Sequence, residues 1–169
     1  MTQQFLTIAV LTVSDTRTLE NDTSGDFLSQ ALTEAGHGLA HRLLVKDDIY
    51  DIRAVVSEWI ASREIHVVLV TGGTGFSGRD STPEAIRPLL DKQVEGFGEV
   101  FRAMSYEEIG SSTIQSRAFA GLANHTLVVC MPGSTGACRT AWRVVKEQLD
   151  STHKPCNFVG TLLADRGAS

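Results

Sequence analysis

The stretch that decides the fold is Val67-Val68-Leu69-Val70-Thr71-Gly72-Gly73-Thr74-Gly75-Phe76-Ser77-Gly78-Arg79-Asp80-Ser81-Thr82-Pro83. Its first four residues are aliphatic without any alternation, which is typical of a strand buried on both faces of a parallel sheet. The glycines that follow end the strand and, because they lack a Cβ, let main-chain N–H groups approach an anion closely. Thr82 before Pro83 has the pattern of a helix N-cap followed by the first helical residue. The stretch therefore predicts a strand, a phosphate-binding loop and a helix start.

The same glycines allow two other interpretations. Gly73, Gly75 and Gly78 spell G-x-G-x-x-G, but a dinucleotide fingerprint needs its third glycine inside a helix that opens at the loop of the first βα unit. Here the helix is expected only after Asp80, and the loop follows the third expected strand, which makes a nicotinamide or flavin site the weaker alternative. A Walker loop is excluded because no Gly-Lys-Ser/Thr follows the glycines. The second alternative is a glycine-rich turn that binds no ligand.

Hydrophobic content and periodicity predict the other elements. Strands are expected, besides residues 67–71, at 5–13, 39–45 and 126–131. Helices are expected where apolar residues recur three or four positions apart, at 28–35, 52–60, 83–89, 100–106 and 137–149, with Asp47 or Asp48 as the cap of the second. Residues 110–121 are left as a helical or short-strand excursion. The β-α-β-α-β order predicts an α/β fold, a three-layer sandwich with a mostly parallel open sheet.

Ligands of such sheets bind where the strands have their carboxyl ends. The ends of the first three expected strands carry Ser14-Asp15, Asp47-Asp48 and the loop Gly72–Asp80, which we expect to converge on one edge. Pro132-Gly133-Ser134-Thr135-Gly136 repeats the pattern of a buried strand that breaks into small residues before a helix. This fourth strand end is either a second anion site at a helix N-terminus or a capped helix start without a ligand.

Length and composition describe an ordinary globular protein. The chain has 169 residues, 42% hydrophobic and 21% charged, so we expect residues 1–169 to form a single domain. No apolar run approaches the ~18 residues of a membrane span. Met1-Thr2-Gln3-Gln4 has no basic segment before the apolar run, so a secretion signal is not expected and a cytoplasmic location is the default.

The net charge and the numbers of cysteines and histidines indicate which kinds of ligand are favoured and which are not. A formal net charge of −5 disfavours nucleic acid, and an anionic ligand would need a divalent cation beside it. The three cysteines are odd in number and lack C-x-x-C spacing, which favours reduced thiols over a zinc site. The five histidines are scattered without metal-binding spacing, and we interpret them as structural.

Four groups of residues, in this order, resemble the MoaB and MogA family of molybdenum cofactor biosynthesis proteins: Val10–Asp15, Asp22–Gly25, Thr71–Gly75 with Arg79–Ala85, and Met131–Ser134. The resemblance covers nearly the whole chain, and Gly96–Arg117 looks most like the bacterial MoaB branch. It implies a molybdopterin-binding fold of the MogA type. It also implies a homo-oligomer, a trimer or a hexamer, which would cover apolar residues between Phe97 and Phe119.

The resemblance implies adenylyl transfer, in which molybdopterin and Mg-ATP give adenylylated molybdopterin and pyrophosphate. Asp47 and Asp80 match the two acidic positions of the family pattern, and we expect them to bind Mg²⁺ and to be catalytic. Arg79 would either neutralise charge or be solvated or paired with a structural carboxylate. The substrate- and phosphate-binding residues implied are Ser14, Asp15, Ser24, Gly25, Thr71, Gly72, Gly73, Thr74, Gly75, Pro132, Gly133 and Ser134.

One departure bears on the activity. Lys46 stands where the adenylylating branch usually has proline, as in MoaB-type sequences, some of which have lost acidic residues of the site. This chain keeps both acids, so we expect an active adenylyltransferase. Two alternatives stay open: a carrier that holds molybdopterin without transferring AMP, and an assembly role like that of the related gephyrin domain, which would use a linker and further domains.

Overall fold

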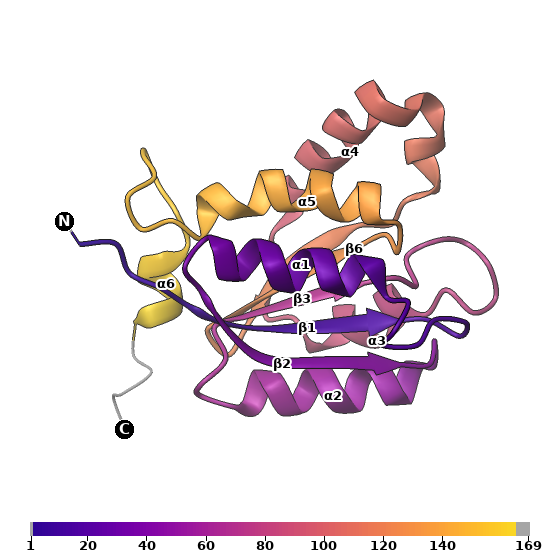
Figure 1. Cartoon of the computed structure of the whole chain (residues 1–169), viewed down its shortest axis with the longest axis horizontal. Helices are drawn as coiled ribbons and strands as arrows, with labels where there is room; N and C mark the ends of the chain where they lie inside the picture. The colour runs from indigo at the N-terminus through magenta and orange to yellow at the C-terminus, as the bar shows by residue number, and fades with distance from the viewer. Residues whose placement is uncertain (1, 165–169) are drawn as a thin grey trace.

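The computed structural model describes residues 2–164, in which six strands form one open sheet between two layers of helices (Figure 1). The strands are β1 Thr7–Val13, β2 Gly38–Val45, β3 Val67–Thr71, β4 Lys92–Gln93, β5 Phe119–Ala123 and β6 Thr126–Met131. Their order across the sheet is β2-β1-β3-β6-β5-β4. The first four of these are mutually parallel, β5 pairs antiparallel with β6, and β4 pairs antiparallel with β5. The expected mostly parallel open sheet is confirmed.

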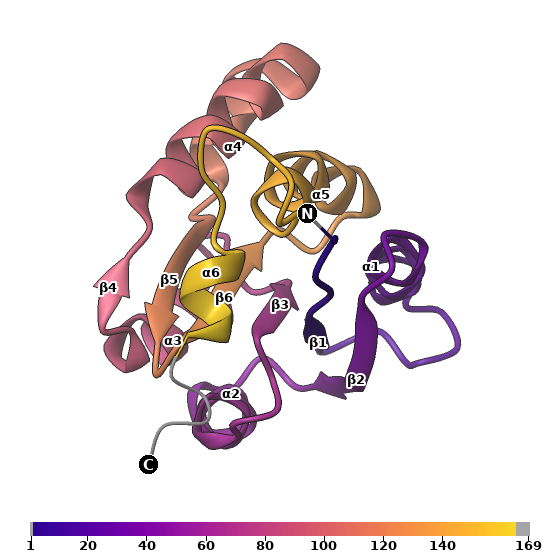
Figure 2. The ribbon, with the colours of Figure 1, turned by 90° about the vertical axis from the view of Figure 1, so that its left-hand side faces the viewer.

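The helices cover both faces of this sheet. They are α1 Thr23–Glu34, α2 Ile49–Ala61, α3 Thr82–Ile86, α4 Glu95–Ile109, α5 Thr135–Gln148 and α6 Val159–Leu163, with 3₁₀-helices η1 Arg87–Leu89 and η2 Gly110–Gln115. In Figure 2, α1, α5 and α4 lie on one side of the sheet and α2 and α3 on the other. The excursion left open at 110–121 consists of η2 followed by the start of β5. Neither β4 nor α6 was expected from the sequence.

The central strand β3 explains why its sequence does not alternate. Val67 and Leu69 pack with α1 and α5, whereas Val68 and Val70 pack with α2 and α3, and all four side chains are fully buried. Burying an aliphatic side chain of this size contributes about 1.5–3 kcal/mol. Both faces of the strand therefore need apolar residues, as expected for a parallel sheet with two helical layers.

Two expectations about helix starts are decided by side-chain contacts. Asp48 caps α2, because its carboxylate accepts the N–H groups of Tyr50 and Asp51, and this leaves Asp47 available for another role. The expectation that Thr82 is an N-cap is wrong. Thr82 is the first residue of α3, and its hydroxyl donates instead to the carbonyl of Gly72 at 2.8 Å. This contact joins Thr82 to the glycine-rich loop of residues 72–80, called the phosphate loop after its predicted ligand, so the hydroxyl is not available to cap the helix.

Helix α4 extends beyond the rest of the molecule in both views (Figures 1 and 2). Large apolar side chains exposed on α4 and η2 are Val100, Tyr106, Ile109 and Ile114. Within residues 2–164 no helix has the length and apolar character needed to cross a membrane.

Candidate functional site

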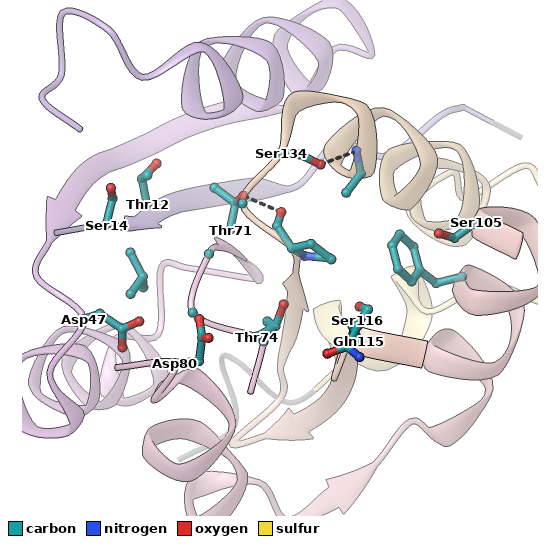
Figure 3. A pocket seen from close by; sticks show the side chains of 18 of the residues that line it. Thr12, Ser14, Asp47, Thr71, Thr74, Asp80, Ser105, Gln115, Ser116 and Ser134 are labelled. Carbon is teal, nitrogen blue, oxygen red and sulfur yellow. Dashed lines mark hydrogen bonds between the residues drawn. The ribbon is translucent and has the colours of Figure 1, made fainter. Parts of the chain in front are cut away.

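A cavity of about 460 Å³ lies where β1, β2, β3 and β6 have their carboxyl ends (Figure 3). The strand ends that line it include Ser14, Asp47, the residues 71–75 and the residues 132–134. The expected convergence of these loops on one edge of the sheet is therefore confirmed. Asp80, at the end of the phosphate loop, lines the same cavity.

In the phosphate loop the carbonyl groups are hydrogen-bonded to other residues, whereas several main-chain N–H groups have no partner among the described residues. Thr82 donates to the carbonyls of Gly72 and Gly73 through its hydroxyl and its main-chain N–H, at 2.8 and 3.0 Å. Arg117 donates to the carbonyls of Thr74 and Gly75 through its main-chain N–H and its Nε, at 3.0 and 2.9 Å. The N–H groups of residues 73–75 donate to no described residue. These N–H groups provide the anion-binding donors that a glycine-rich loop of this kind can present.

Glycine is needed at two of the four positions in this loop, Gly72 and Gly73, and at a third, Gly75, a side chain would displace Asp80. Gly72 and Gly73 have positive φ angles of 105° and 68°, and an added Cβ would lie 2.1 and 2.3 Å from neighbouring oxygens. Gly75 lacks a positive φ, but a Cβ there would lie 2.7 Å from the carboxylate of Asp80. Around Gly78 there is open space, and α3 begins only at Thr82. The third glycine of the G-x-G-x-x-G pattern is thus outside any helix, which contradicts a dinucleotide fingerprint.

The second glycine loop lies beside the first. The hydroxyl of Thr71 donates to the carbonyl of Pro132 at 2.9 Å, and a Cβ added to Gly133 would lie 3.4 Å from the Cα of Gly72. Ser134 caps α5 by accepting the N–H of Ala137. The N–H groups of residues 133–136 donate to no described residue. A second group of free amides, at the positive end of the α5 dipole, therefore borders the same cavity.

Asp47 and Asp80 lie on the same side of the cavity, with Ser105 and Gln115 across from them (Figure 3). Asp47 is only 8% exposed, and its Oδ1 accepts the N–H of Ser81 at 2.9 Å. Burial raises the pKa of Asp47, and the neighbouring charges of Asp80 and Asp15 raise it further. The site therefore concentrates negative charge that a bound cation would offset.

Asp80 keeps one carboxylate oxygen open. Its Oδ2 accepts the N–H of Ser77 at 2.8 Å, while its Oδ1 accepts no hydrogen bond from the described residues. Residues 2–164 contain no group of three or more His, Cys, Asp or Glu side chains able to hold a metal ion. A cation here would therefore have to take most of its ligands from phosphate and water. Mg²⁺ binds in that way, commonly through one or two carboxylates plus substrate phosphates, so the donor set fits Mg²⁺.

Arg79 is paired with a structural carboxylate, one of its two expected roles. Its Nε and Nη2 donate to the two carboxylate oxygens of Asp15 at 2.9 and 2.8 Å. This contact, together with the main-chain N–H of Asp47, lowers the pKa of Asp15 to about 2. Asp15 does not line the cavity. It acts one step away, because its carboxylate accepts the main-chain N–H of Asp47. A direct contact of Asp15 with substrate stays a prediction.

Ser24 and Gly25 also lie outside the cavity lining. Both are buried at the start of α1, where the hydroxyl of Ser24 donates to the carbonyl of Gly133 at 2.7 Å. The N–H of Gly25 donates to the carboxylate of Asp22, which caps the helix. In this structure Ser24 therefore supports the second glycine loop and Gly25 the start of α1, and the contact of either residue with substrate stays a prediction.

Sequence reasoning missed a positively charged side chain that borders the cavity. Arg17 is the one Lys or Arg side chain among the described lining residues, and its Nη1 donates to Ser24 at 2.9 Å. It also lies 3.5 Å from the buried carboxylate of Asp22. That carboxylate already accepts from Thr12 and pairs with Arg42. The negative charge of Asp22 is thus shared with Arg42, so Asp22 does not fully neutralise the positive charge of Arg17.

Sequence reasoning also missed the wall formed by α4 and η2. Its lining residues are Phe101, Ser105, Ile109, Ser112, Gln115 and Ser116. The only signal in the sequence was the apolar spacing of Phe97 and Phe101, which marks a buried helix face but no site. This wall gives the cavity a partly apolar side opposite the carboxylates.

Two of the three cysteines and two histidines have structural environments. Cys130 and Cys138 are buried, and burial raises the pKa of both thiols, which keeps them protonated at neutral pH. The Nδ1 atoms of His37 and His66 accept main-chain N–H groups of β1 or the residue before it. These contacts agree with the interpretation of both histidines as structural.

Comparison with known proteins gives concordant results. The family described as "Probable molybdopterin binding domain" matches residues 9–151. The protein "Molybdenum cofactor biosynthesis protein B" of Escherichia coli (strain K12) is 58% identical over 152 residues, 89% of each chain. A crystal structure of a protein of the same name has a TM-score of 0.83 at 44% identity, covering 86% of this chain and 92% of its own. The tungsten cofactor synthesizing protein MoaB of Pyrococcus furiosus has a TM-score of 0.78 at 36% identity, with the same coverage.

Proposed function

This chain belongs to the molybdenum cofactor biosynthesis protein B family of probable molybdopterin-binding domains, and on that basis we propose that it transfers AMP from ATP to molybdopterin during molybdenum cofactor biosynthesis. One observation carries the proposal. Two carboxylates, Asp47 and Asp80, border the same cavity as two groups of free main-chain amides. Carboxylates that share a cavity with anion-binding donors suit a reaction between phosphates that needs a divalent cation.

The proposed reaction forms one P–O bond and breaks another. An oxygen of the terminal phosphate of molybdopterin attacks the α-phosphorus of ATP. The bond from that phosphorus to the oxygen bridging to the β-phosphate breaks, and pyrophosphate leaves with the electron pair. No oxidant or reductant is needed. The main demand on the protein is to hold two polyanions together and in line.

The residues of the cavity meet this demand with donors on two sides. The amides of residues 73–75 and 133–136 are free to donate to phosphate oxygens, and Arg17 adds a full positive charge. Asp47 and Asp80 would hold Mg²⁺, which when bound offsets phosphate charge as the pyrophosphate leaves. The exposed apolar side chain of Ile109 on the α4–η2 wall suits a flat heteroaromatic ring such as a pterin.

The test is an assay of the purified chain with molybdopterin and Mg-ATP. Adenylylated molybdopterin and pyrophosphate should appear in equal amounts, and omission of Mg²⁺ should abolish both. Asp80→Asn serves as the inactive control, and Gly78→Ala, at a position with open space, serves as the active one. Molybdopterin binding without AMP transfer would reject the transferase and identify a carrier protein.

We further propose that the chain forms a homo-oligomer, a trimer or a hexamer. The supporting observation is the exposed apolar surface of α4 and η2, which carries Val100, Tyr106, Ile109 and Ile114. Light scattering at micromolar concentration measures the assembly directly. A monomer would contradict this part of the proposal.

A further inference from the structure

Arg117, between η2 and β5, does not line the cavity but contacts the phosphate loop at several points. Its Nε donates to the carbonyl of Gly75 at 2.9 Å and its Nη2 to the carbonyl of Asp80 at 2.8 Å. Its Nη1 pairs with the carboxylate of Glu84 in the first turn of α3, and its main-chain N–H donates to Thr74 at 3.0 Å. One residue thus contacts both ends of the loop segment 75–80.

Peptide geometry gives these contacts a consequence for the cavity. In a trans peptide the carbonyl of one residue and the N–H of the next point in opposite directions. Arg117 holds the carbonyls of Thr74 and Gly75, so the N–H groups of Gly75 and Phe76 point away from Arg117. Neither N–H donates to a described residue, and Gly75 itself lines the cavity. The main-chain contact of Arg117 therefore sets the direction of the Gly75 donor, and its guanidinium holds the peptide that follows Gly75.

The rest of the segment has few contacts of its own. Residues 76–79 are exposed, and the internal contacts are those between Ser77 and Asp80. The bidentate ion pair of Arg79 with Asp15 also holds the segment, but it is largely exposed and is therefore screened by salt. The Arg117 side chain, in contrast, is 24% exposed and also lies over the ring of Phe76 at 5.2 Å. Hydrogen bonds from a shielded guanidinium are the stronger constraint.

We propose that Arg117 is a positioning residue for the reaction: its guanidinium holds the main chain at Gly75 and at Asp80, which keeps the Gly75 amide in place for the bound phosphate and fixes the main chain from which Asp80 reaches the cation. The inference deepens the proposed function and rests on it for the identity of the phosphate ligand. Arg117 acts from outside the cavity, through the loop, and touches no reacting atom.

Lysine is a useful replacement because it keeps the charge and loses the geometry. A single ammonium group cannot reproduce the fork that reaches Gly75, Asp80 and Glu84 at once. Arg53 offers a matched control, since its Nε and Nη2 donate to the carbonyls of Ala85 and Glu84, both at 3.0 Å. Both arginines thus bridge two main-chain carbonyls, but the Arg53 contacts are on α3 and not on the loop.

The experiment compares Arg117→Lys and Arg117→Ala with Arg53→Lys and Arg53→Ala in the full chain. Calorimetric titration with pyrophosphate and Mg²⁺ gives the anion affinity, and hydrogen exchange gives the protection of the hydrogen-bonded amides of Ser77, Asp80 and Ser81. We expect both Arg117 variants to bind pyrophosphate at least tenfold more weakly and to exchange these amides faster. The Arg53 variants should stay within twofold of the wild type even where their melting temperatures fall. Arg117→Lys is the variant of choice if Arg117→Ala does not fold.

The outcomes separate this inference from the proposed function. If the wild type binds pyrophosphate but transfers no AMP, the proposed function fails, while a selective loss of affinity in the Arg117 variants still supports the positioning role. If transfer does occur, the Arg117 variants should also need a higher Mg²⁺ concentration for half-maximal turnover. Wild-type affinity and wild-type loop exchange in a folded Arg117 variant would overturn the inference, as would a wild type that binds no pyrophosphate.

Discussion

The carboxylate of Asp47 accepts a hydrogen bond of 2.9 Å from the main-chain N–H of Ser81, the residue that follows Asp80. Asp47 lies two residues after the end of β2, and Ser81 lies between the phosphate loop and α3. The two acidic residues are therefore connected through one main-chain contact, although they come from different strand ends. Residues that share such a contact do not act independently, so we expect Asp47 and Asp80 substitutions to have non-additive effects.

Asp80→Asn tests the catalytic assignment. The change keeps the size of the side chain and an oxygen that can accept the Ser77 N–H, but it removes the charge. We expect turnover in the adenylylation assay to fall about a hundredfold or more, ~2.7 kcal/mol of transition-state stabilisation. Molybdopterin affinity and melting temperature should stay close to the wild type. Near-normal turnover would reject Asp80 as a catalytic residue, and a large loss of stability would identify it as structural.

Asp47→Asn should separate stability from activity. Burial and neighbouring charges raise the pKa of Asp47 in the folded state above the ordinary value of 3.8. The folded state therefore holds this proton more tightly than the unfolded state, and the free energy of unfolding falls as pH rises through the window above 3.8. Asparagine cannot ionise, so the variant should lack this loss and melt at a higher temperature than the wild type at neutral pH without Mg²⁺. Turnover should nevertheless fall by about a hundredfold.

Thermal melting of both proteins at neutral pH and below pH 3.8 checks the sign of this effect. The difference in melting temperature should shrink in acid, where the wild-type carboxyl is protonated in both states. An Asp47→Asn variant that is less stable at neutral pH would mean that the charged form of Asp47 stabilises the fold.

Gly75→Ala and Gly78→Ala form a matched pair within one loop. A Cβ on residue 75 would lie 2.7 Å from the Asp80 carboxylate, whereas a Cβ on residue 78 meets no atom within 4 Å. We expect Gly75→Ala to weaken pyrophosphate binding about tenfold or more, ~1.4 kcal/mol, with little loss of melting temperature. Gly78→Ala should match the wild type in both measurements. Equal losses of stability and affinity in Gly75→Ala would make Gly75 a purely structural glycine.

Arg17→Gln tests whether the positive charge of Arg17 contributes to anion binding. The variant keeps hydrogen-bonding capacity toward Ser24 but removes the positive charge beside the cavity. We expect pyrophosphate affinity to fall about tenfold and its dependence on salt to weaken, because a charge contact with phosphate is lost. Stability should change little, since Asp22 still pairs with Arg42. Arg143→Gln, which removes an exposed arginine paired with Glu108, is the control and should leave affinity unchanged.

Much of the fold could be predicted because it depends on local patterns. The unbroken apolar run of β3 indicated burial on both faces, and the glycines after it indicated the loop. The strand ends at Asp47 and at Pro132–Ser134 could be brought to the same edge from topology alone. Strands β4 and β5 were harder. Lys92–Gln93 is too short to show a period, and β5 contains Gly121, where an added Cβ would lie 2.5 Å from the Leu90 side chain and 2.8 Å from the carbonyl of Lys92.

The sequence by itself determined the sheet and the glycine-rich loop of residues 72–80, because strand burial, glycine conformation and chain order are properties of neighbouring residues, and Asp47 and Asp80 were predicted from the family resemblance. Only the tertiary structure decided which side chains hold that loop and which border the cavity. Arg117 is 42 residues from Gly75 and 37 from Asp80, and no local spacing predicts that its guanidinium would reach both carbonyls. The physical reason is that these contacts depend on how η2 and β5 pack beside β3, which brings distant segments into hydrogen-bonding range only once the sheet has formed.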